Sequence, residues 1–254
     1  MKLIVPFGLL LILIAGVSAQ VKTPIPAAVR VPFERSLQTI VVTTNDWNAT
    51  QGVARLFERK NAGSKWVANG DAFPIVVGRS GLAWDELQAS GQKDAKIKKE
   101  GDGNAPAGRF PLTASFGSGS KPNALDLPYT KLEEYTECVD DVKSSFYNRI
   151  VNRMQVGNFD WKSSEKMLAI GKEYDLGIFV AYNSYPVERG RGSCIFLHIW
   201  KDAASATSGC TAMERRDLER ILGWVTAAKN PYLVQLPKDV YEKNRKSWNL
   251  PKLK

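Results

Sequence analysis

Cys210 and His198 are the residues whose types and spacing could carry out nucleophilic chemistry. His198 is the only histidine in the 254-residue chain, so any imidazole base must be this one. An imidazole activates a cysteine by taking the thiol proton. Gly209, directly before Cys210, permits a tight turn that would fold the cysteine back over the end of a strand carrying His198. We therefore predict a Cys–His pair.

The histidine lies in a segment, residues 193–200, that is predicted to be a strand. Alternate side chains of a strand face opposite ways. The face with His198 also carries Cys194, Phe196 and Trp200, whereas Ile195, Leu197 and Ile199 form a core face. Four strand residues separate Cys194 from His198 by about 13 Å, which excludes Cys194 as its partner. On this pattern alone, a purely structural histidine remains an alternative.

A helix is predicted over residues 213–228, where apolar side chains recur on one side. Thr211 and Glu214 have the spacing of a capping box, which would start this helix just after Cys210. A helix N-terminus favours a thiolate over a thiol. Its free amides could also hold a developing oxyanion. We therefore expect Cys210 to lie at the beginning of a helix.

The chain has three cysteines. An odd number leaves at least one thiol unpaired unless chains are linked to each other. A disulfide between Cys138 and Cys194 would leave Cys210 free, and we carry this pairing as a hypothesis. Three cysteines and one histidine would also satisfy zinc, but the chain has no CxxC pair. We predict no metal and no cofactor.

The first residues resemble no globular segment. A lysine, a long apolar run and small residues before Gln20 predict a signal peptide over residues 1–19. The alternative is an uncleaved anchor, but the apolar run is shorter than the ~20 residues that span a bilayer. We expect export to the periplasm or cell envelope, without stable membrane association after cleavage. Residues 20–36, with three prolines, are predicted to be a linker.

The remaining pattern predicts one mainly β domain over residues 37–230 with a few helices. Short β-branched and apolar runs separated by turn residues indicate an antiparallel meander. The predicted strands are residues 37–43, 53–58, 65–68, 73–77, 109–114, 174–182 and 193–200. A second, weaker helix is predicted over residues 163–172. Residues 231–254 are predicted to be a basic tail.

The net charge is +9 at pH 7. Such a charge either forms solvated surface or attracts a polyanion. Export argues against nucleic acid as that polyanion. An anionic polymer of the envelope is the more plausible partner.

Several segments in order resemble one known family. The stretch GRGSCIFLHIW…ATSGCTAM (190–213) is similar to the catalytic segment of YkuD-type L,D-transpeptidases. The other similar segments are GRSGLAW (78–84), KKEGDGNAPAGRFPL (98–112), CVDD (138–141), SFYNR (145–149) and YDLGIFVAYN (174–183). The resemblance covers roughly residues 37–226.

The resemblance implies a sandwich-like or barrel-like β fold that acts on peptidoglycan stem peptides. It implies Cys210 as nucleophile, His198 as base, and the amides of Gly209 and Cys210 as oxyanion donors. Ser208 would orient the substrate or the imidazole. Family members form a thioester with release of terminal D-alanine, and an amine then resolves it without any cofactor. Candidate residues of the substrate groove are Tyr182, Asn183 and Ser193.

The chain departs from many members of this family around the cysteine. These members carry a histidine before the glycine and an arginine after the cysteine, whereas this chain has Ser208 before the glycine and Thr211 and Ala212 after the cysteine. The acceptor is therefore open: water in place of an amine would make the protein an L,D-carboxypeptidase or amidase-type hydrolase. A non-catalytic wall-binding protein is the alternative from another class. The oligomeric state is not predicted.

Overall fold

The computed structural model describes residues 32–89 and 94–253. The predicted signal peptide and residues 20–31 of the predicted linker lie outside the described residues. None of the helices in the described part is long and apolar enough to cross a lipid bilayer.

The described residues form two β-sheets, two α-helices and five short 3-10 helices. The strands are β1 (Gln38–Thr44), β2 (Gln51–Glu58), β3 (Val67–Ala68), β4 (Phe73–Val76), β5 (Leu82–Trp84), β6 (Ala105–Gly117), β7 (Tyr129–Lys131), β8 (Thr136–Val139), β9 (Ile150–Asn152), β10 (Ser164–Lys166), β11 (Leu176–Val180), β12 (Phe196–Ile199), β13 (Thr211–Met213) and β14 (Tyr232–Pro237). The helices are α1 (Arg215–Trp224), α2 (Lys238–Asn244), η1 (Phe33–Arg35), η2 (Glu86–Gln88), η3 (Met167–Ile170), η4 (Lys172–Tyr174) and η5 (Ala227–Lys229).

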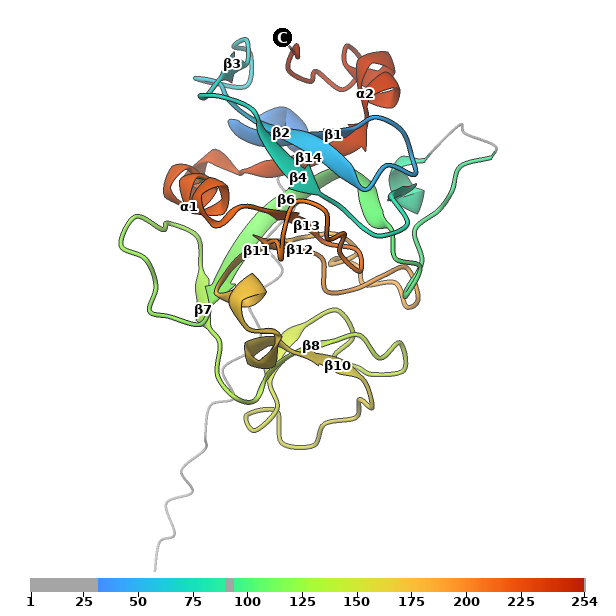
Figure 1. Cartoon of the computed structure of the whole chain (residues 1–254), viewed down its shortest axis with the longest axis vertical. Coiled ribbons are helices and arrows are strands. Elements are labelled where there is room, and N and C mark those ends of the chain that lie inside the picture. The colour runs from blue at the N-terminus through green and yellow to red at the C-terminus, as the bar shows by residue number, and fades with distance from the viewer. Residues whose placement is uncertain (1–31, 90–93, 254) are drawn as a thin grey trace, which may run out of the picture.

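The large sheet closes on itself as a barrel. Its strands follow the order β1-β14-β6-β11-β12-β13-β4-β2, and pairing of β1 with β2 completes the ring. Closure leaves few unpaired edges, so the backbone groups of these strands are satisfied within the barrel. The mainly β, barrel-like fold predicted from the sequence is confirmed (Figure 1).

The first strand shows why this sequence forms barrel walls. All residues of β1 are buried, including the branched run Ile40, Val41 and Val42. Branched side chains suit a pleated strand. β14 and β2 cover the two edges of β1. Its side chains pack in the main core, and α2 packs against the strand. The strand therefore belongs to the main core.

The C-terminal segment is not a basic tail. Residues 232–237 form β14, which lies between β1 and β6 in the barrel. Leu233 and Leu236 are fully buried, and Val240 and Tyr241 of α2 are also in the core. The lysines of this segment obscured a short apolar run that the barrel needs for closure.

The end of the predicted linker also belongs to the folded unit. Phe33 is buried and packs against the rings of Trp66 and Tyr232. Arg59 donates hydrogen bonds to the carbonyl oxygens of Phe33 and Glu34. These contacts fix residues 33–36 on the barrel, so the expectation of a linker up to residue 36 is wrong at its C-terminal end.

Both helix predictions require correction. Residues 164–166 are strand β10, followed by 3-10 turns, because Glu165 pairs with Cys138 of β8. The stronger helix begins at Arg215, and residues 211–213 are strand β13. The expected capping box is absent, since the Thr211 hydroxyl bonds with Gln235.

A small three-stranded sheet in the order β10-β8-β9 lies beside the end of the barrel formed by β11, β12 and β13 (Figure 1). A disulfide joins Cys138 of this sheet to Cys194, directly ahead of β12. The hypothesised pairing is therefore present, and Cys210 is the free cysteine. Two sulfurs bonded to each other cannot serve the zinc site weighed as an alternative.

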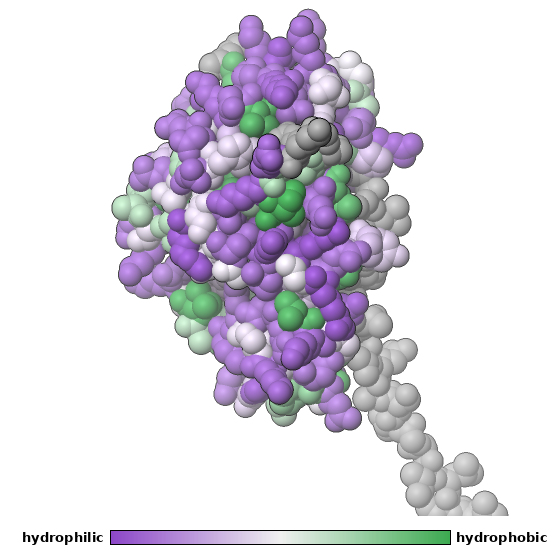
Figure 2. All heavy atoms as spheres, turned by 90° about the vertical axis from the view of Figure 1, so that its right-hand side faces the viewer, coloured by the Kyte–Doolittle hydropathy of each residue, from purple (hydrophilic) through white to green (hydrophobic). Residues whose placement is uncertain are grey.

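The molecular face in Figure 2 is mostly hydrophilic, with apolar residues in small separate groups. A mainly hydrophilic face is typical of a protein surface in contact with water.

We expect Leu233→Ala to lower the free energy of unfolding by about 2–5 kcal/mol, because it empties a fully buried site in β14. Lys238→Ala, at an exposed position directly after the strand, should change it by less than about 0.5 kcal/mol. Urea titrations of both variants measure the difference. Equal stabilities would mean that residues 232–237 are not part of the barrel.

Replacing both Cys138 and Cys194 by serine should cost about 4 kcal/mol, because the bridge closes a loop with a sequence separation of 56. Urea titration gives this value. Alkylation of the unfolded wild-type chain should label one cysteine without reductant and three after reduction. Three labels without reductant would show that the bridge does not form.

Candidate active site

The two chemically active candidates lie on neighbouring parallel strands. β12 pairs with β13, so that Leu197 is opposite Thr211 and His198 is opposite Ala212. Continuing this register places Cys210 level with Phe196. The predicted alternation of β12 is also found, because Leu197 and Ile199 pack in the main core while Phe196 and Cys210 belong to a second apolar cluster.

The sulfur of Cys210 is held by backbone groups of the segment that enters β12. The amide of Phe196 donates to Sγ at 3.3 Å, and the thiol donates to the carbonyl oxygen of Cys194 at 3.4 Å. The residue is only 7% exposed. The free thiol is therefore fixed at a defined place, at the end of the barrel near the small sheet.

His198 is held in one tautomer by the backbone. Its Nδ1 lies 2.8 Å from the carbonyl oxygen of Ile199, which can only accept a hydrogen bond, so Nδ1 carries the proton. Nε2 has no hydrogen-bond partner among the described residues and keeps its lone pair. Burial lowers the pKa of His198, although the Ile199 hydrogen bond and Glu173 oppose this shift. The imidazole is therefore a neutral base at pH 7.

The imidazole and the sulfur share one face of the β12–β13 pair. Two residues along adjacent strands correspond to roughly 8 Å between their Cα atoms. No hydrogen bond joins His198 to Cys210 in the described structure. Tyr174 of η4 lies beside both: its ring packs against the imidazole at 5.3 Å between centroids, and it belongs to the same buried cluster as Cys210.

The expected helix N-terminus at the cysteine is wrong, because β13 separates Cys210 from α1. The thiol therefore lacks the dipole that was expected to favour ionisation. Burial and the nearby Glu165 carboxylate raise the pKa of Cys210 far above that of a free thiol. The Phe196 amide, Lys98 and Tyr174 oppose this shift. Cys210 is thus a protonated thiol in the resting site.

The turn before the cysteine is tied together by Thr207. Its hydroxyl donates to the carbonyl oxygen of Cys210 at 2.7 Å and accepts the amide of Gly209 at 3.1 Å. The Gly209 amide, predicted to be an oxyanion donor, is therefore engaged within the turn. Ser208 is exposed at the tip of the same turn.

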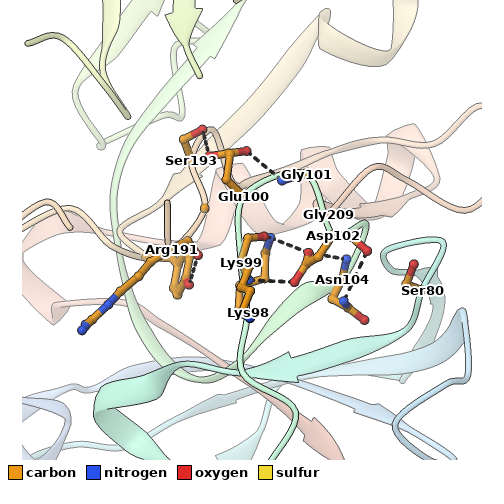
Figure 3. Close-up of polar contacts among 12 residues, drawn as sticks. Ser80, Lys98, Lys99, Glu100, Gly101, Asp102, Asn104, Arg191, Ser193 and Gly209 are labelled. Carbon is orange, nitrogen blue, oxygen red and sulfur yellow. Dashed lines mark hydrogen bonds and ion pairs between the residues drawn. The ribbon is translucent and has the colours of Figure 1, made fainter. Parts of the chain in front are cut away.

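A loop over residues 98–104 packs against this turn (Figure 3). Asp102 organises the loop: it accepts hydrogen bonds from the Lys98 ammonium at 2.8 Å and from the amides of Lys99 and Asn104. Burial alone would raise the pKa of Asp102, but these bonds hold it below its usual value. A Cβ on Gly209 would lie 3.1 Å from the Asn104 carbonyl oxygen, so the loop approaches the turn closely.

Ser193, predicted to line the substrate groove, is buried and bonded to the same loop. Its hydroxyl donates to Glu100 at 2.7 Å, and the Tyr147 hydroxyl donates to the same carboxylate. Figure 3 shows Ser193 and Glu100 pointing toward each other. Ser193 therefore connects the segment that leads into β12, the strand of His198, to the loop over residues 98–104.

The other two groove candidates have structural roles. Tyr182 is fully buried against Phe110, and its hydroxyl donates to the carbonyl oxygen of Arg191 at 2.5 Å. The Asn183 amide group donates to the carbonyl oxygens of Glu188 and Gly192 and accepts the Glu188 amide. The polar groups of both side chains are therefore bonded within the chain. These bonds hold the loop before β12.

Sequence reasoning missed two residues beside the thiol, Tyr174 and Glu165. Tyr174 stood at the start of a predicted strand, and Glu165 was assigned to a helix. Tyr174 begins one of the segments that resemble the family, whereas Glu165 lies in none of them, and they meet only because the small sheet lies beside the barrel. Spatial proximity of this kind has no local signal in a single sequence.

Comparison with protein families found one match: the family model described as the L,D-transpeptidase catalytic domain, YkuD, covers residues 54–237. Comparisons with curated proteins and with solved structures found no match. The matched range contains Cys210, His198, the small sheet and all of β14. It spans well over half of the chain.

We expect Gly209→Ala to destabilise the protein by about 1–3 kcal/mol, because φ at this residue is +153° and the new methyl group would meet the Asn104 carbonyl oxygen. Gly223→Ala, in α1 with open space around it, should instead be neutral or slightly stabilising. Thermal unfolding of both variants checks this contrast. A Gly209→Ala variant as stable as the Gly223→Ala variant would contradict the close packing of the turn.

Proposed function

The chain belongs to the L,D-transpeptidase catalytic domain family, which acts on peptidoglycan, and we propose that it is an exported cysteine acyltransferase specific for stem peptides. Cys210 is the proposed nucleophile and His198 the proposed base. The acyl donor is a stem peptide that ends in D-alanine, and the acceptor is an amine.

One observation carries this proposal. The single free thiol of the described chain and a neutral imidazole with an unprotonated Nε2 occupy the same face of two paired strands. A thiol becomes a strong nucleophile when a neighbouring base removes its proton. The tautomer set by Ile199 directs the basic nitrogen away from the backbone, so that it is free for this task.

The proposed reaction has two steps. Nε2 of His198 takes the proton of Cys210, and the sulfur attacks the carbonyl carbon between the third residue and the terminal D-alanine. The tetrahedral intermediate collapses to a thioester as the amide nitrogen leaves with the proton from His198. An acceptor amine then attacks the thioester, gives its proton to His198, and releases the thiol.

The intermediate carries a negative oxygen that needs hydrogen-bond donors. The amides of Gly209 and Cys210 are the proposed donors, and Gly209 would exchange its bond with Thr207 for one with the oxyanion. Ser208, exposed beside them, is the proposed contact with the peptide backbone. The close support by Asn104 keeps this turn in place during the exchange.

The disulfide supports export. A bridge between Cys138 and Cys194 persists only where the compartment is oxidising, as in the periplasm or outside the cell. The signal-peptide pattern at the start of the sequence leads to the same proposal. The net charge of +9 would favour residence near anionic polymers of the envelope.

Incubation with a stem tetrapeptide should add to Cys210 the mass of the peptide minus D-alanine, because the thioester forms before the acceptor binds. Adding an amine acceptor should produce joined peptides. Both Cys210→Ser and His198→Ala should lower turnover by at least about 10³-fold, since each removes one half of the pair. Intact mass spectrometry and chromatography of the muropeptides measure both steps.

Lys201→Gln, at an exposed position after β12, serves as a matched control and should keep wild-type turnover. Trimmed peptides without joined products would assign the hydrolase. Wall binding without any adduct on Cys210 would assign a non-catalytic protein. Near-wild-type turnover by Cys210→Ser would refute the nucleophile.

A further inference from the structure

The hydroxyl of Tyr174 lies between the candidate nucleophile and a carboxyl group. It donates a hydrogen bond to Oε2 of Glu165 at 2.7 Å, and its side chain belongs to the same buried cluster as Cys210, whose pKa it lowers. The Tyr174 ring packs against Phe196 at 5.6 Å and against His198 at 5.3 Å between centroids. The hydroxyl is therefore held in place by two aromatic contacts.

A phenol has one proton to donate, and an ionised carboxylate can only accept. While Glu165 is ionised, the Tyr174 proton is directed to Glu165, which weakens the interaction by which Tyr174 would stabilise a thiolate. Once Glu165 is protonated, it can donate to Tyr174 instead, and the phenol proton becomes free to stabilise a thiolate.

The small sheet and the disulfide fix this arrangement. Glu165 of β10 is directly opposite Cys138 of β8. Cys138 is bonded to Cys194, whose carbonyl oxygen accepts the Cys210 thiol. The strand with the carboxyl group is thus covalently connected to the segment that holds the sulfur.

We propose that Glu165 is a positioning residue that, through the hydroxyl of Tyr174, decides whether Cys210 is held as a thiol or stabilised as a thiolate. Tyr174, which lies between Glu165 and the site, is then a second positioning residue. This assignment rests on the proposed role of Cys210 as nucleophile. It gives the small sheet a function in the reaction.

The surroundings of Glu165 bring its titration into the neutral range. Burial, together with the carboxylates of Asp140 and Glu100, raises its pKa to about 7, and the Tyr174 hydrogen bond opposes this shift. The charged and titratable groups that face the three residues are Asp140, Glu100, Lys98 and His198. Below about pH 7 Glu165 is protonated, and the pKa of Cys210 is lower than it is with an ionised Glu165. Above about pH 7 the carboxylate raises the pKa of Cys210.

Alkylation of the folded protein by iodoacetamide tests the coupling without any peptidoglycan. The thiolate displaces iodide to form a carbon–sulfur bond, and the thiol proton passes to the buffer. Because Cys138 and Cys194 are bonded to each other, the label reports on Cys210 alone. The wild-type rate should rise with pH but show an inflection near pH 7, where Glu165 ionises and slows further thiolate formation.

Glu165→Gln should abolish the inflection, because the amide is uncharged and can donate to Tyr174 at every pH. Its alkylation rate should match the wild type near pH 5.5 and exceed it by about tenfold at pH 8.5, which corresponds to one pKa unit of coupling. Glu134→Gln removes the same charge from an exposed position near the small sheet and should keep the wild-type profile.

Tyr174→Phe keeps the ring contacts and removes only the hydroxyl, so it tests the proposal even where Glu165→Gln fails to fold. Its profile should show a smaller inflection, because only the direct effect of the Glu165 charge on the thiol remains, and adding Glu165→Gln to it should change the rate by less than tenfold. A wild-type profile without inflection would overturn the proposal. A full effect of Glu165→Gln in the Tyr174→Phe background would do so too, since the coupling would then bypass the hydroxyl.

Failure of this inference and failure of the proposed function give different results. The alkylation profile depends only on Glu165, Tyr174 and Cys210, whereas the thioester depends on peptide binding. An inflection without any thioester would support the coupling and reject the peptide substrate. A thioester with a flat alkylation profile would do the opposite.

Discussion

The parallel pairing of β12 with β13 is the constraint on which the site depends. It sets Cys210 level with Phe196 and His198 level with Ala212, and strand alternation then directs the thiol and the imidazole to one face. A shift of one residue in this register would turn one of the two side chains into the core. The core packing of Leu197 and Ile199 resists such a shift, so the hydrophobic core fixes the chemistry.

The sequence predicted those parts of the molecule that local patterns determine. The alternation in residues 195–199 and the mainly β class could be predicted from residue types and spacing. The Cys138–Cys194 pairing could only be raised as a hypothesis, because three cysteines do not determine which two are bonded. The start of α1 could not, because tertiary pairing of residues 211–213 in β13 outweighed a capping-box pattern. The structural contacts of Tyr182 and Asn183 could not be predicted for a related reason: burial and hydrogen-bond partners are properties of the folded loop.

The resting site combines a neutral imidazole with a thiol that is hard to ionise. Burial produces both properties, because a low-polarity environment disfavours the charged forms of both groups. A reactive thiolate would be exposed to oxidation in the compartment that allows the Cys138–Cys194 bridge to persist. In the proposed mechanism, keeping the proton on Cys210 until a peptide arrives protects the nucleophile, while Nε2 of His198 remains ready to accept that proton.

The place of β14 in the barrel has a consequence for how the protein acquires its structure. β1 is the first strand of the described residues, and its parallel partner, β14, lies far along the sequence from it. Until residue 237 has emerged, β1 and β6 both lack that neighbour and the wall between them is open. Contacts of such long sequence separation form slowly. The barrel wall thus stays open until late in synthesis, which would suit the proposed export, since a chain that has not yet closed can pass through a narrow secretion channel.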